Sequence, residues 1–425
     1  MITEPASRLL MGLFKAAVQA VSAEHVLKEQ LPVEPAKGTT LILGAGKAAA
    51  AMADVAARTI PGRLSGLVVT RYGHGLNPDR DTRSSIECVE AGHPVPDVAA
   101  QQAAHRMLEI VRSAAPHDRI VMLLSGGASS LLPLPAPGLS LGHKREVTRS
   151  LLESGARIDE INCVRRHLSL IKGGRLARAT NVPILTLAIS DVPGNNPVDI
   201  GSGPTVPDPT TLADARSVIA RYRLTVPAAV GDALNSPQNE TPKPAAGDAG
   251  QLTTRIIATA SDALAAAATA ARAAGLEVVL LGENLEGDAR TLGATHATLA
   301  LEYAKRPGRW LLLSGGETTV RVQHREGCGG RNLEYLTGLA VCLDGHPGIH
   351  ALACDTDGID GTEDNAGAWL NPTTLKAAAA CGLDGRDALA RNRTYELFAS
   401  VKQLIVTGPT RTNVNDFRAV LVEGH

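Results

Sequence analysis

The sequence "LLSGGASSLL" (residues 123–132) is an apolar run that stops at Ser-Gly-Gly, and "LLLSGGETTV" (residues 311–320) repeats the pattern later in the chain. Strands that are buried on both faces of a sheet have continuous apolar sequences of this kind. Glycine at the end of such a strand allows a tight turn into the next segment. The two stretches therefore predict two separate strands, each closed by a glycine turn.

Apolar runs that end at Gly or Asp and lead into helical patterns recur along the chain. Examples are "TTLILGAGKAAAAMADVAAR", "VPILTLAISDVPGN" and "GIHALACDTDGIDG". Alternation of such strands with helices is typical of α/β proteins with parallel sheets. We therefore predict an α/β fold of two domains, with mostly parallel sheets and flanking helices.

The length of 425 residues exceeds that of one ordinary hydrophobic core, which favours two domains. The stretch "LNSPQNETPKPAAGDAGQL" is rich in Pro, Asn, Gly and Asp and lacks periodicity, which is typical of a linker. We predict a first domain over residues 1–235, a linker over 236–250 and a second domain over 251–425. The N-terminal stretch "MITEPASRLLMGLFKAAVQAV" predicts an amphipathic helix that packs on either domain.

Composition narrows the choice of partners and location. Apolar residues make up 44% of the chain, the formal net charge is −1, and no run approaches the ~18 apolar residues of a membrane span. This balance indicates neither a nucleic-acid nor a membrane partner. The six cysteines form no CxxC pair and the N-terminus has no long apolar region, so we expect a cytoplasmic protein with reduced thiols. The sequence leaves open whether the protein is a monomer or a homodimer.

The glycine turns at the ends of the predicted strands are candidate phosphate sites. In open parallel sheets, ligands bind beyond the carboxyl ends of the strands, where helix N-termini offer free N–H groups and a partial positive charge. Two Ser-Gly-Gly turns, each followed by paired hydroxyl residues, favour phosphate binding over glycines that only make turns. The candidates for nucleotide or phosphate binding are Gly44, Gly46, Ser125, Gly126, Gly127, Ser130, Ser314, Gly315, Gly316 and Thr318.

The stretch "GAGKAA" (residues 44–49) matches the G-x-G-x-x-A fingerprint of dinucleotide-binding folds. The acid expected about 20 residues later is missing, and the next predicted strand ends at Arg71 instead. Lys47, at the start of the expected helix, would meet an anion directly. These features disfavour NAD, leave NADPH as an alternative because of Arg71, and make Lys47 a candidate anion contact.

Acidic residues follow several of the predicted strands. Asp191 lies in a Gly/Pro/Asn-rich loop past one strand, Asp357 lies in "DTDGIDG" past another, and Glu317 follows the second Ser-Gly-Gly. A few oxygen ligands from strand-end loops suit Mg²⁺ that is shared with substrate phosphates. Asp followed by Gly is also typical of a plain turn. We take Asp191, Asp357 and Glu317 as candidate magnesium ligands.

Two arginines and an asparagine are candidate substrate contacts, together with Lys47. Arg331 begins the helix predicted from "GGRNLEYLTGLA", where a cation is unfavourable unless an anion shares the site. Arg166 belongs to the basic stretch "INCVRRHLSLIKGGRLARAT", which is either a solvated face or a wall that holds an anionic substrate. Asn195 lies in the same Asn-rich loop as Asp191.

Taken together, these motifs resemble the glycerate 2-kinase family, whose members combine an N-terminal Rossmann-like domain with a C-terminal MOFRL domain. The resemblance spans nearly the whole chain in one order. The motifs that carry it are "GAGKAA" at Gly44, "GHPVPD" at Gly92, "LLSGGASSLL" at Leu123, "INCVRRHLSLIKGGRLA" at Ile161, "SDVPGNNPVDIGSGPTVPDPTT" at Ser190, "LSGGETTV" at Leu313, "GGRNLE" at Gly329, "DTDGIDG" at Asp355 and "TGPTRTNVNDFR" at Thr407.

The resemblance implies that ATP phosphorylates D-glycerate to 2-phospho-D-glycerate with Mg²⁺, in a cleft between the two α/β domains. It also implies that Lys47 and Arg331 are catalytic, and we add Asp191 to this group. The chain departs from the family phrase at Arg411, where a glycine is usual. That departure leaves the backbone and any nucleotide contact of this loop open.

Two rival functions remain at this stage. Some members of the family carry the label hydroxypyruvate reductase, and an NADPH-dependent reductase would use the G-x-G-x-x-A turn and Arg71. Such an enzyme needs a full dinucleotide site and a proton donor beside the carbonyl. A non-catalytic binding protein for sugar acids or nucleotides is the other rival, and it has no need of Lys47 and clustered acids together.

Overall fold

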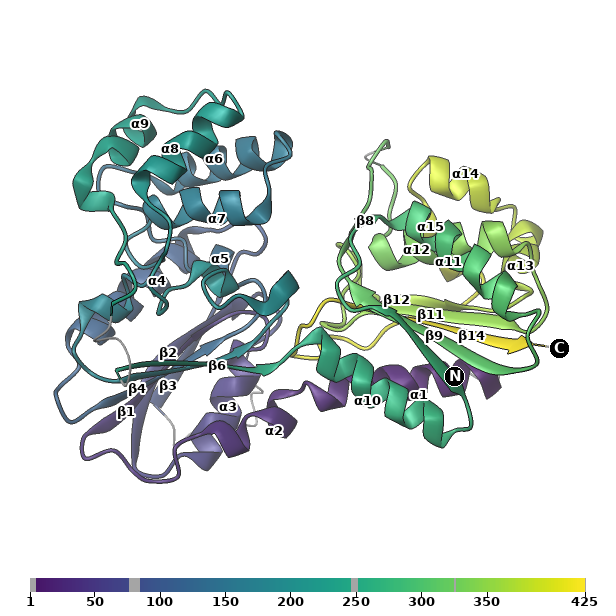
Figure 1. Ribbon diagram of the computed structural model, residues 1–425, viewed down its shortest axis with the longest axis horizontal. Helices are drawn as coiled ribbons and strands as arrows, with labels where there is room; N and C mark the ends of the chain where they lie inside the picture. Colours follow the sequence, from purple (N-terminus) through teal and green to yellow (C-terminus); the bar gives the residue numbers. More distant parts are fainter. Residues whose placement is uncertain (1–4, 76–84, 246–250, 325, 425) are drawn as a thin grey trace. The chain divides into compact units, whose positions relative to one another are not determined.

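The computed structural model describes residues 5–75, 85–245, 251–324 and 326–424. The chain divides into two compact units (Figure 1): the N-terminal unit comprises residues 23–257, and the C-terminal unit combines residues 1–22 with residues 258–425. The N-terminal helix α1 (Pro5–Ala20) therefore belongs to the C-terminal unit. Its Phe14 ring packs on Phe417 with the ring centroids 5.7 Å apart, and Thr412 Oγ1 donates a hydrogen bond to the Val21 carbonyl.

The N-terminal unit is built on a six-stranded sheet with the strand order β3-β2-β1-β4-β5-β6. The pairs from β3 to β5 are all parallel, which confirms the predicted α/β architecture for this unit. All carboxyl ends of these five strands therefore lie at one edge of the sheet. The strands are β1 (Thr39–Ala45), β2 (Arg63–Arg71), β3 (Ser85–Ala91), β4 (Arg119–Leu124), β5 (Ile184–Ile189) and β6 (Leu252–Ala258).

The central strands β1, β4 and β5 are buried on both faces, which explains their largely apolar sequences. Leu43 belongs to a core cluster with residues of α4, whereas Ile42 points to the opposite face, and both side chains are fully buried. Helices α6 to α9 have an apolar cluster of their own (Figure 1). The α-helices of this unit are α2 (Ala23–Val26), α3 (Ala49–Thr59), α4 (Val98–Arg112), α5 (Ala128–Leu131), α6 (Leu141–Glu153), α7 (Ile158–His167), α8 (Leu212–Arg221) and α9 (Ala228–Asn235). The short 3₁₀ helices are η1 (Lys28–Gln30), η2 (Ala177–Ala179), η3 (Pro193–Asn195), η4 (Ile200–Ser202) and η5 (Pro237–Asn239).

The chain passes into the C-terminal unit after β6, beyond the linker predicted over residues 236–250. The Ile184 N–H donates to the Gln251 carbonyl, and β6 then joins the first sheet beside β5. Backbone pairing thus keeps residues 251–257 in the N-terminal unit. The Pro- and Asn-rich composition and the lack of periodicity indicated a linker. They did not indicate the residue at which pairing with the first sheet ends. Residues 246–250 lie outside the described residues.

The sheet of the C-terminal unit has the order β13-β12-β11-β14-β9-β7 and is mixed, whereas parallel pairing was predicted. Only β7 and β9 are parallel, and the other four pairs are antiparallel. Strand β14 reaches the middle of the sheet from the edge strand β13 without a crossover helix. A continuous apolar sequence reports burial on both faces but not strand direction. The strands are β7 (Glu277–Gly282), β9 (Gly308–Gly316), β11 (Ile349–Asp355), β12 (Gly367–Leu370), β13 (Leu404–Ile405) and β14 (Asp416–Gly424), with β8 (Gly287–Asp288) and β10 (Thr318–Thr319) paired separately.

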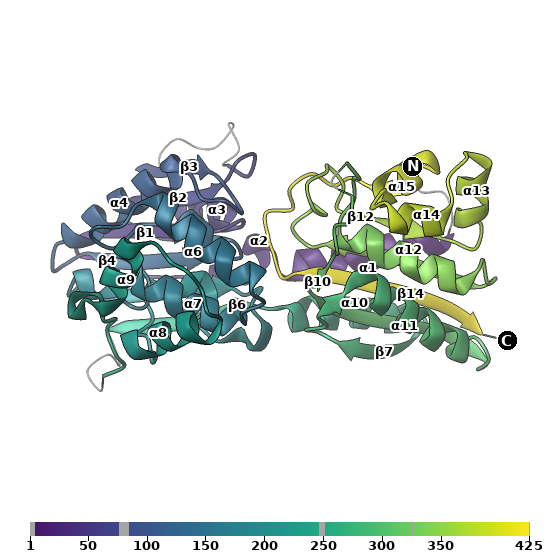
Figure 2. The same cartoon turned by 90° about the horizontal axis from the view of Figure 1, so that it is seen from above.

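Helices also cover both faces of the second sheet (Figures 1 and 2). Helices α1 and α10 lie on one face and α11 and α12 on the other. Leu312 and Val420 are directly paired and pack toward α11 and α12, whereas Phe417 contacts α1. The remaining helices of this unit are α10 (Ala260–Ala273), α11 (Ala289–Tyr303), α12 (Arg331–Leu343), α13 (Thr374–Ala380), α14 (Gly385–Ala390) and α15 (Thr394–Ser400).

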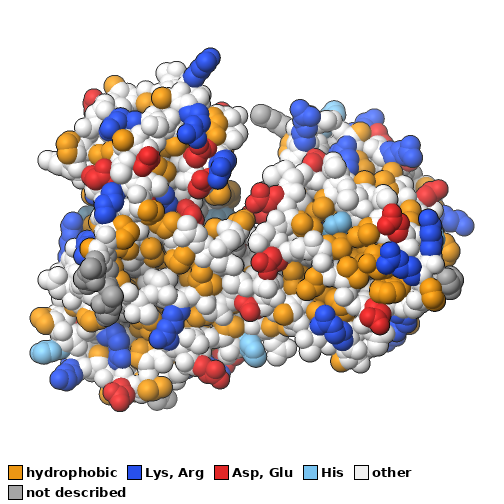
Figure 3. Space-filling view, viewed as in Figure 1, with side chains coloured by type: hydrophobic (Ala, Val, Ile, Leu, Met, Phe, Trp, Pro, Cys, Tyr) orange, Lys and Arg blue, Asp and Glu red, His pale blue; other side chains and the backbone are white. Residues whose placement is uncertain are grey.

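The surface shows no dominance of one charge. On the face seen in Figure 3, Lys and Arg side chains alternate with Asp and Glu side chains over both units. This distribution accords with the formal net charge of −1. Within the part of the chain that the structure describes, no helix is both long and apolar enough to cross a membrane.

Candidate functional site

Three predicted site residues follow neighbouring parallel strands of the N-terminal unit. Lys47 follows β1, Ser125 follows β4 and Asp191 follows β5. Strand β4 pairs with β1 on one side and with β5 on the other, both in parallel. The carboxyl edge of the sheet thus gathers these residues, where ligands of open α/β sheets bind.

Hydrogen bonds tie the glycine turn after β1 to the Ser-Gly-Gly turn after β4. The Lys47 N–H donates to the Gly126 carbonyl over 2.9 Å, and the Ala48 N–H donates to Ser125 Oγ over 2.9 Å. Gly46 has a φ of 129°, and a Cβ at this position would lie 2.2 Å from Ser125 Oγ. The glycine therefore allows the two turns to approach each other.

This arrangement departs from the dinucleotide-binding function that the G-x-G-x-x-A fingerprint suggested. In that function, the loop N–H groups and the helix N-terminus face a pyrophosphate. Here the N–H groups of Lys47 and Ala48 are bonded to the neighbouring turn, and the Ala49 N–H donates to the Gly46 carbonyl. The half-buried Lys47 side chain, two residues before α3, instead contributes positive charge at this edge.

The first Ser-Gly-Gly turn is itself closely packed. Gly127 has a φ of 85° and immediately precedes α5, and a Cβ there would lie 2.8 Å from the His93 ring. Ser130 Oγ donates to the Gly127 carbonyl over 3.0 Å. The buried Lys172 ammonium donates to the carbonyl and hydroxyl of Ser129 and to the Gly201 carbonyl. Burial, with nearby cations, lowers the pKa of Lys172 well below its usual value.

The two remaining substrate-binding candidates of this unit have different environments. Arg166 is only 2% exposed, so it is not part of a solvated basic face, which was one of the two alternatives left open by the sequence. Its guanidinium lies 3.1 Å from Asp199 and 3.0 Å from Asp208, which assigns it a role in packing α7 against the following loops. Asn195 ends η3, a short way beyond Asp191, with a φ of 51°.

The second Ser-Gly-Gly has a different local structure from the first. Ser314, Gly315 and Gly316 are the last three residues of β9 and pair with β14, and no helix follows directly. The helix N-terminus on which the predicted phosphate site depended therefore does not follow this turn. Ser314 Oγ is buried and has no hydrogen-bond partner among the described residues. Thr318 Oγ1 accepts a hydrogen bond from Arg418.

Arg331, at the start of α12, is surrounded by carboxylates. Its Nη1 lies 2.8 Å from Glu317, its Nη2 lies 2.6 Å from Asp355, and its Nε lies 2.8 Å from Asp416. Burial alone would lower the pKa of Arg331, but Asp416, Asp355 and Glu317 outweigh burial and raise this pKa well above its usual value. The guanidinium is therefore permanently charged and held on three sides.

The N-terminus of α12 is also occupied by a carboxylate. Asp360 is fully buried and accepts hydrogen bonds from the Asn332 and Leu333 N–H groups. Burial raises the pKa of Asp360 to about 6, while these N–H bonds oppose the shift. Asp357 is buried as well, and its Oδ1 accepts a hydrogen bond from the Ile359 N–H.

Two residues near Arg331 had no role assigned from the sequence. Asp416 opens β14 and pairs with Asp355 on one side and Gly316 on the other, while Arg418 lies two residues further along the same strand face. Both side chains are completely buried. Charged residues two apart at the start of the apolar run "DFRAVLVEG" are the signal that would have identified them.

The candidate magnesium ligands do not form a metal site by themselves. Among the described residues, no group of three His, Cys, Asp or Glu side chains is arranged to hold a metal ion. In the C-terminal unit, Glu317 is paired with Arg331, and Asp357 accepts from its own loop. Protein carboxylates alone thus do not supply a cage for Mg²⁺.

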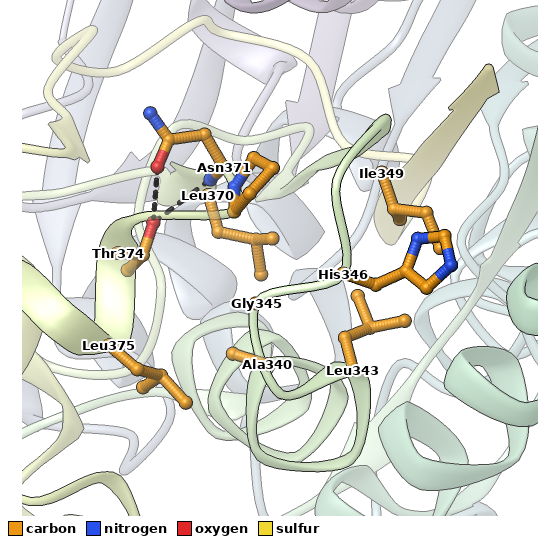
Figure 4. A pocket seen from close by; sticks show the side chains of 10 residues that line it. Ala340, Leu343, Gly345, His346, Ile349, Leu370, Asn371, Thr374 and Leu375 are labelled. Carbon is orange, nitrogen blue, oxygen red and sulfur yellow. Dashed lines mark hydrogen bonds between the residues drawn. The ribbon is translucent and has the colours of Figure 1, made fainter.

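A small pocket in the C-terminal unit, shown in Figure 4, lies at the end of α12, whereas Arg331 is at the start of this helix. It is lined by residues from the end of α12, the end of β12 and the start of α13. Its polar contacts in Figure 4 join Thr374 and Asn371 to each other, and no Asp, Glu, Lys or Arg lines it. The pocket lacks the charged groups that recognition of a phosphate requires.

Comparisons with known proteins show which family the chain is similar to. A family model described as "Domain of unknown function (DUF4147)" matches residues 9–235, and the MOFRL family model matches residues 310–416. D-glycerate 2-kinase of Thermotoga maritima is 36% identical over 421 residues, which cover 97% of this chain and 97% of that protein. An Agrobacterium vitis protein named "Putative hydroxypyruvate reductase" is 47% identical over 425 residues, 98% of this chain and 94% of that protein.

The fold comparison gives the same answer. The crystal structure of glycerate kinase from Thermotoga maritima matches with a TM-score of 0.85 and 35% identity, over 99% of this chain and 100% of that chain. The sequence motifs and the structural match extend over nearly the whole chain, and the two family models each match one part of it. The chain therefore belongs to the glycerate 2-kinase family, in which a DUF4147 domain is combined with a MOFRL domain.

Proposed function

We propose that this protein is a kinase that transfers the γ-phosphoryl group of ATP to the 2-hydroxyl of D-glycerate. The observation that carries the proposal is the turn before α3. Its N–H donors are bonded to the Ser125–Gly127 turn, and it brings the ammonium group of Lys47 to the ligand-binding edge of the sheet. The full-length similarity to D-glycerate 2-kinase supports the same reaction.

Phosphoryl transfer depends mainly on alignment and on positive charge around the moving group. We assign Lys47 to the transferring phosphoryl group, because its ammonium adds to the positive end of α3. We assign Arg331 to an anionic group of a substrate, because its guanidinium cannot lose its charge beside three carboxylates. Ser125 orients the Lys47 turn through its bond to the Ala48 N–H.

Magnesium is expected to arrive with ATP rather than to reside in the protein. Mg²⁺ usually keeps several waters and takes only one or two carboxylates in addition to substrate phosphates. Asp191, Asp357 and Glu317 are the residues we propose to contribute such single contacts, and the ion would offset phosphate charge. Asp357→Asn should therefore weaken the Mg²⁺ dependence of ATP binding measured by calorimetry. An unchanged dependence would mean that Asp357 only forms the turn.

The test of the function is a pair of assays on the purified protein with MgATP and D-glycerate. ADP release is measured first, and the product is then offered to enolase without phosphoglycerate mutase, because enolase consumes only the 2-phospho isomer. We expect both signals. ADP release without an enolase signal would indicate that the 3-hydroxyl, and not the 2-hydroxyl, receives the phosphoryl group.

The hydroxypyruvate reductase function is tested in the same experiment. The name of the Agrobacterium vitis relative favours it, whereas the bonded N–H groups of the "GAGKAA" turn disfavour a dinucleotide at this edge. We expect no NADPH oxidation with hydroxypyruvate. NADPH oxidation without ADP release would overturn the kinase assignment. Ligand binding without any turnover would favour a binding protein.

A further inference from the structure

The inference begins with the three partners of Arg331, which differ in exposure. Glu317 is 52% exposed, whereas Asp355 is 4% exposed and Asp416 is fully buried. Only the Glu317 contact, at Nη1, is therefore accessible to exchange with an incoming anion. The Nε and Nη2 sides of the guanidinium are held by groups that cannot leave the interior.

The carboxylate of Asp416 is shared between two arginines. Its Oδ1 accepts from Arg331 Nε over 2.8 Å and from Asn332 Nδ2 over 2.8 Å. Its Oδ2 accepts from Arg418 Nη2. A carboxylate that bridges two guanidinium groups has its orientation fixed by both, because each pair uses a different oxygen.

Arg418 is in turn held by the interior of the C-terminal unit. Its Nη1 donates to the Gly315 carbonyl over 3.0 Å, and its Nη2 donates to Thr318 Oγ1 over 3.2 Å. The guanidinium also lies over the Tyr335 ring, 5.4 Å from the centroid. Tyr335 OH bonds to His296 Nδ1 over 2.8 Å, which continues the polar contacts into α11.

Charge explains why a second arginine is needed. Asp355, Asp416 and Glu317 carry three negative charges, whereas Arg331 carries one positive charge. A buried carboxylate without a partner is costly. Arg418 compensates Asp416 from the interior side. Without Arg418, Asp416 would turn toward the remaining cation, and the Nη1 side of Arg331 would no longer hold a fixed direction.

We propose that Arg418 is a positioning residue for Arg331: through the shared carboxylate of Asp416, it fixes the inner side of the Arg331 guanidinium so that Nη1 is presented to an anionic group of the substrate. This inference rests on the proposed kinase function and on the assignment of Arg331 to a substrate anion. Arg418 itself is fully buried and would not touch the substrate. Its effect on the reaction therefore passes through Arg331.

The kinetic test is a double-mutant cycle between Arg418 and Arg331. Arg418→Met should lower kcat by about 100-fold, as expected for a misplaced reacting contact, with little change in KM for ATP. In an Arg331→Met background, the same change should alter kcat by less than about twofold, because its route of action is already gone. An equal loss of kcat in both backgrounds would overturn the proposal.

Arg418→Lys provides the conservative variant and serves if the Met variant fails to fold. Lysine keeps the buried charge but, as a point charge on a single nitrogen, cannot reproduce the fork that joins Asp416, Gly315 and Thr318. We expect kcat to recover only in part. Full recovery would mean that charge alone is needed, and no recovery beyond Met would point to the fork geometry.

Arg290→Met is the matched control. Arg290 also forms an ion pair with a buried acid of α12, Glu334, and donates to the Leu389 carbonyl, but the hydrogen bonds and ion pairs of Arg331 go to other residues. This variant should lose stability while kcat stays within about twofold of the native value. A loss of kcat as large as that of Arg418→Met would show that any damage to α12 has the same effect and would overturn the proposal.

A readout without catalysis separates this proposal from the proposed function. The Nε–H signal of Arg331 can be followed by NMR and assigned by its absence in Arg331→Lys. We expect its exchange with water to be at least about 10-fold faster in Arg418→Met than in the native protein or Arg290→Met, because the Asp416 bond is loosened. Unchanged exchange would refute the positioning role even if the protein proves to be a glycerate kinase. Faster exchange in a protein without kinase activity would support the positioning of Arg331 and refute only the function.

Discussion

Residues 125–127 and 314–316 have the same Ser-Gly-Gly sequence but different structures. The first is a turn between β4 and α5, and the second is the paired end of β9. The neighbouring strand accounts for the difference. Beside β4, strand β1 ends in a glycine turn at the same level, whereas beside β9 the strand β14 continues the pairing through Gly316. A short motif therefore takes its structure from the strand next to it.

The charges at the two sheet edges differ in the same way. In the N-terminal unit, Lys47 precedes α3, and the neighbouring Ala48 N–H is bonded to a neutral hydroxyl. In the C-terminal unit, Arg331 is held by three carboxylates, and the first N–H groups of α12 are bonded to Asp360. The first edge is arranged to attract an anion, and the second is arranged to hold a cation in place.

The largest expected effect comes from removing the charge at the first edge. Lys47→Met should lower kcat by about 10²–10³-fold, because a preorganised charge that acts on the transition state is lost. KM should change less than kcat. Folding should be preserved, since the bonds of this turn come from its backbone N–H groups. Steady-state kinetics with a melting curve measure both effects.

Lys47→Arg is the control for charge alone. A planar guanidinium differs in shape from a compact ammonium, so this variant should recover activity only in part. A near-normal kcat in Lys47→Met, with only a higher KM for D-glycerate, would contradict the assignment. Lys47 would then bind the ground state of the substrate and not the transferring group.

The carboxylate at the start of α12 should give the next largest effect, seen as a dependence of stability on pH. Burial raises the pKa of Asp360 to about 6, and Asp416 adds to this shift while Arg331 opposes it. A carboxyl group with a raised pKa binds its proton more tightly in the folded state. Its contribution is therefore fully present below the unfolded pKa and is lost as pH rises through about 6. Between pH 4 and 7 the loss should be about 2–3 kcal/mol.

The measurement compares the native protein with Asp360→Asn, which cannot titrate at this position. The free energies of unfolding of both proteins are measured by urea denaturation at each pH. As pH rises from 4 to 7, the native protein should lose stability relative to the variant. A difference that is flat over this range would mean that Asp360 is ionised throughout. The N–H groups of α12 and the Arg331 charge would then outweigh its burial.

The sequence predicted those features that depend on local pattern. Continuous apolar runs identified the buried strands, and Gly and Asp at their ends located Lys47, Ser125 and Asp357 near the edges of the sheets. An unfavourable cation at a helix start singled out Arg331 as a candidate anion contact, but it did not indicate the three carboxylates that hold this side chain. These inferences needed only the neighbours of each residue in the chain.

Features that depend on pairing between distant segments could not be predicted. The direction of β14, its position between β9 and β11, and the bridge from Asp416 to both arginines all arise from strand order. Burial of Arg166 likewise depends on Asp199 and Asp208 from later loops. Sequence pattern reports which residues are apolar, but not which charged residues find partners in the interior.

A smaller effect should separate the two serines. Ser125→Ala leaves the buried Ala48 N–H without its acceptor and should lower the free energy of unfolding by about 1–3 kcal/mol. Ser314→Ala removes a hydroxyl that has no partner among the described residues, so it should be neutral or slightly stabilising. Urea denaturation of both variants under one condition gives the comparison. Equal losses would indicate that Ser314 is bonded through an ordered water.

The smallest expected effect concerns residues with a positive φ. In the turns after β1 and β4, these are Gly46 and Gly127, whereas in the loop before β14 Arg411 has a φ of 61°. A left-handed conformation costs an L-residue about 1–2 kcal/mol, and glycine avoids this cost but loses about 0.5–1 kcal/mol of chain entropy on folding. Arg411→Gly should therefore stabilise the protein by at most about 1 kcal/mol and raise Tm by a few degrees, roughly 2–4 °C. Arg411→Ala keeps the Cβ and should give no such gain in the same melting experiment. If both variants lower Tm equally, the Arg411 side chain stabilises this loop by more than its backbone conformation costs.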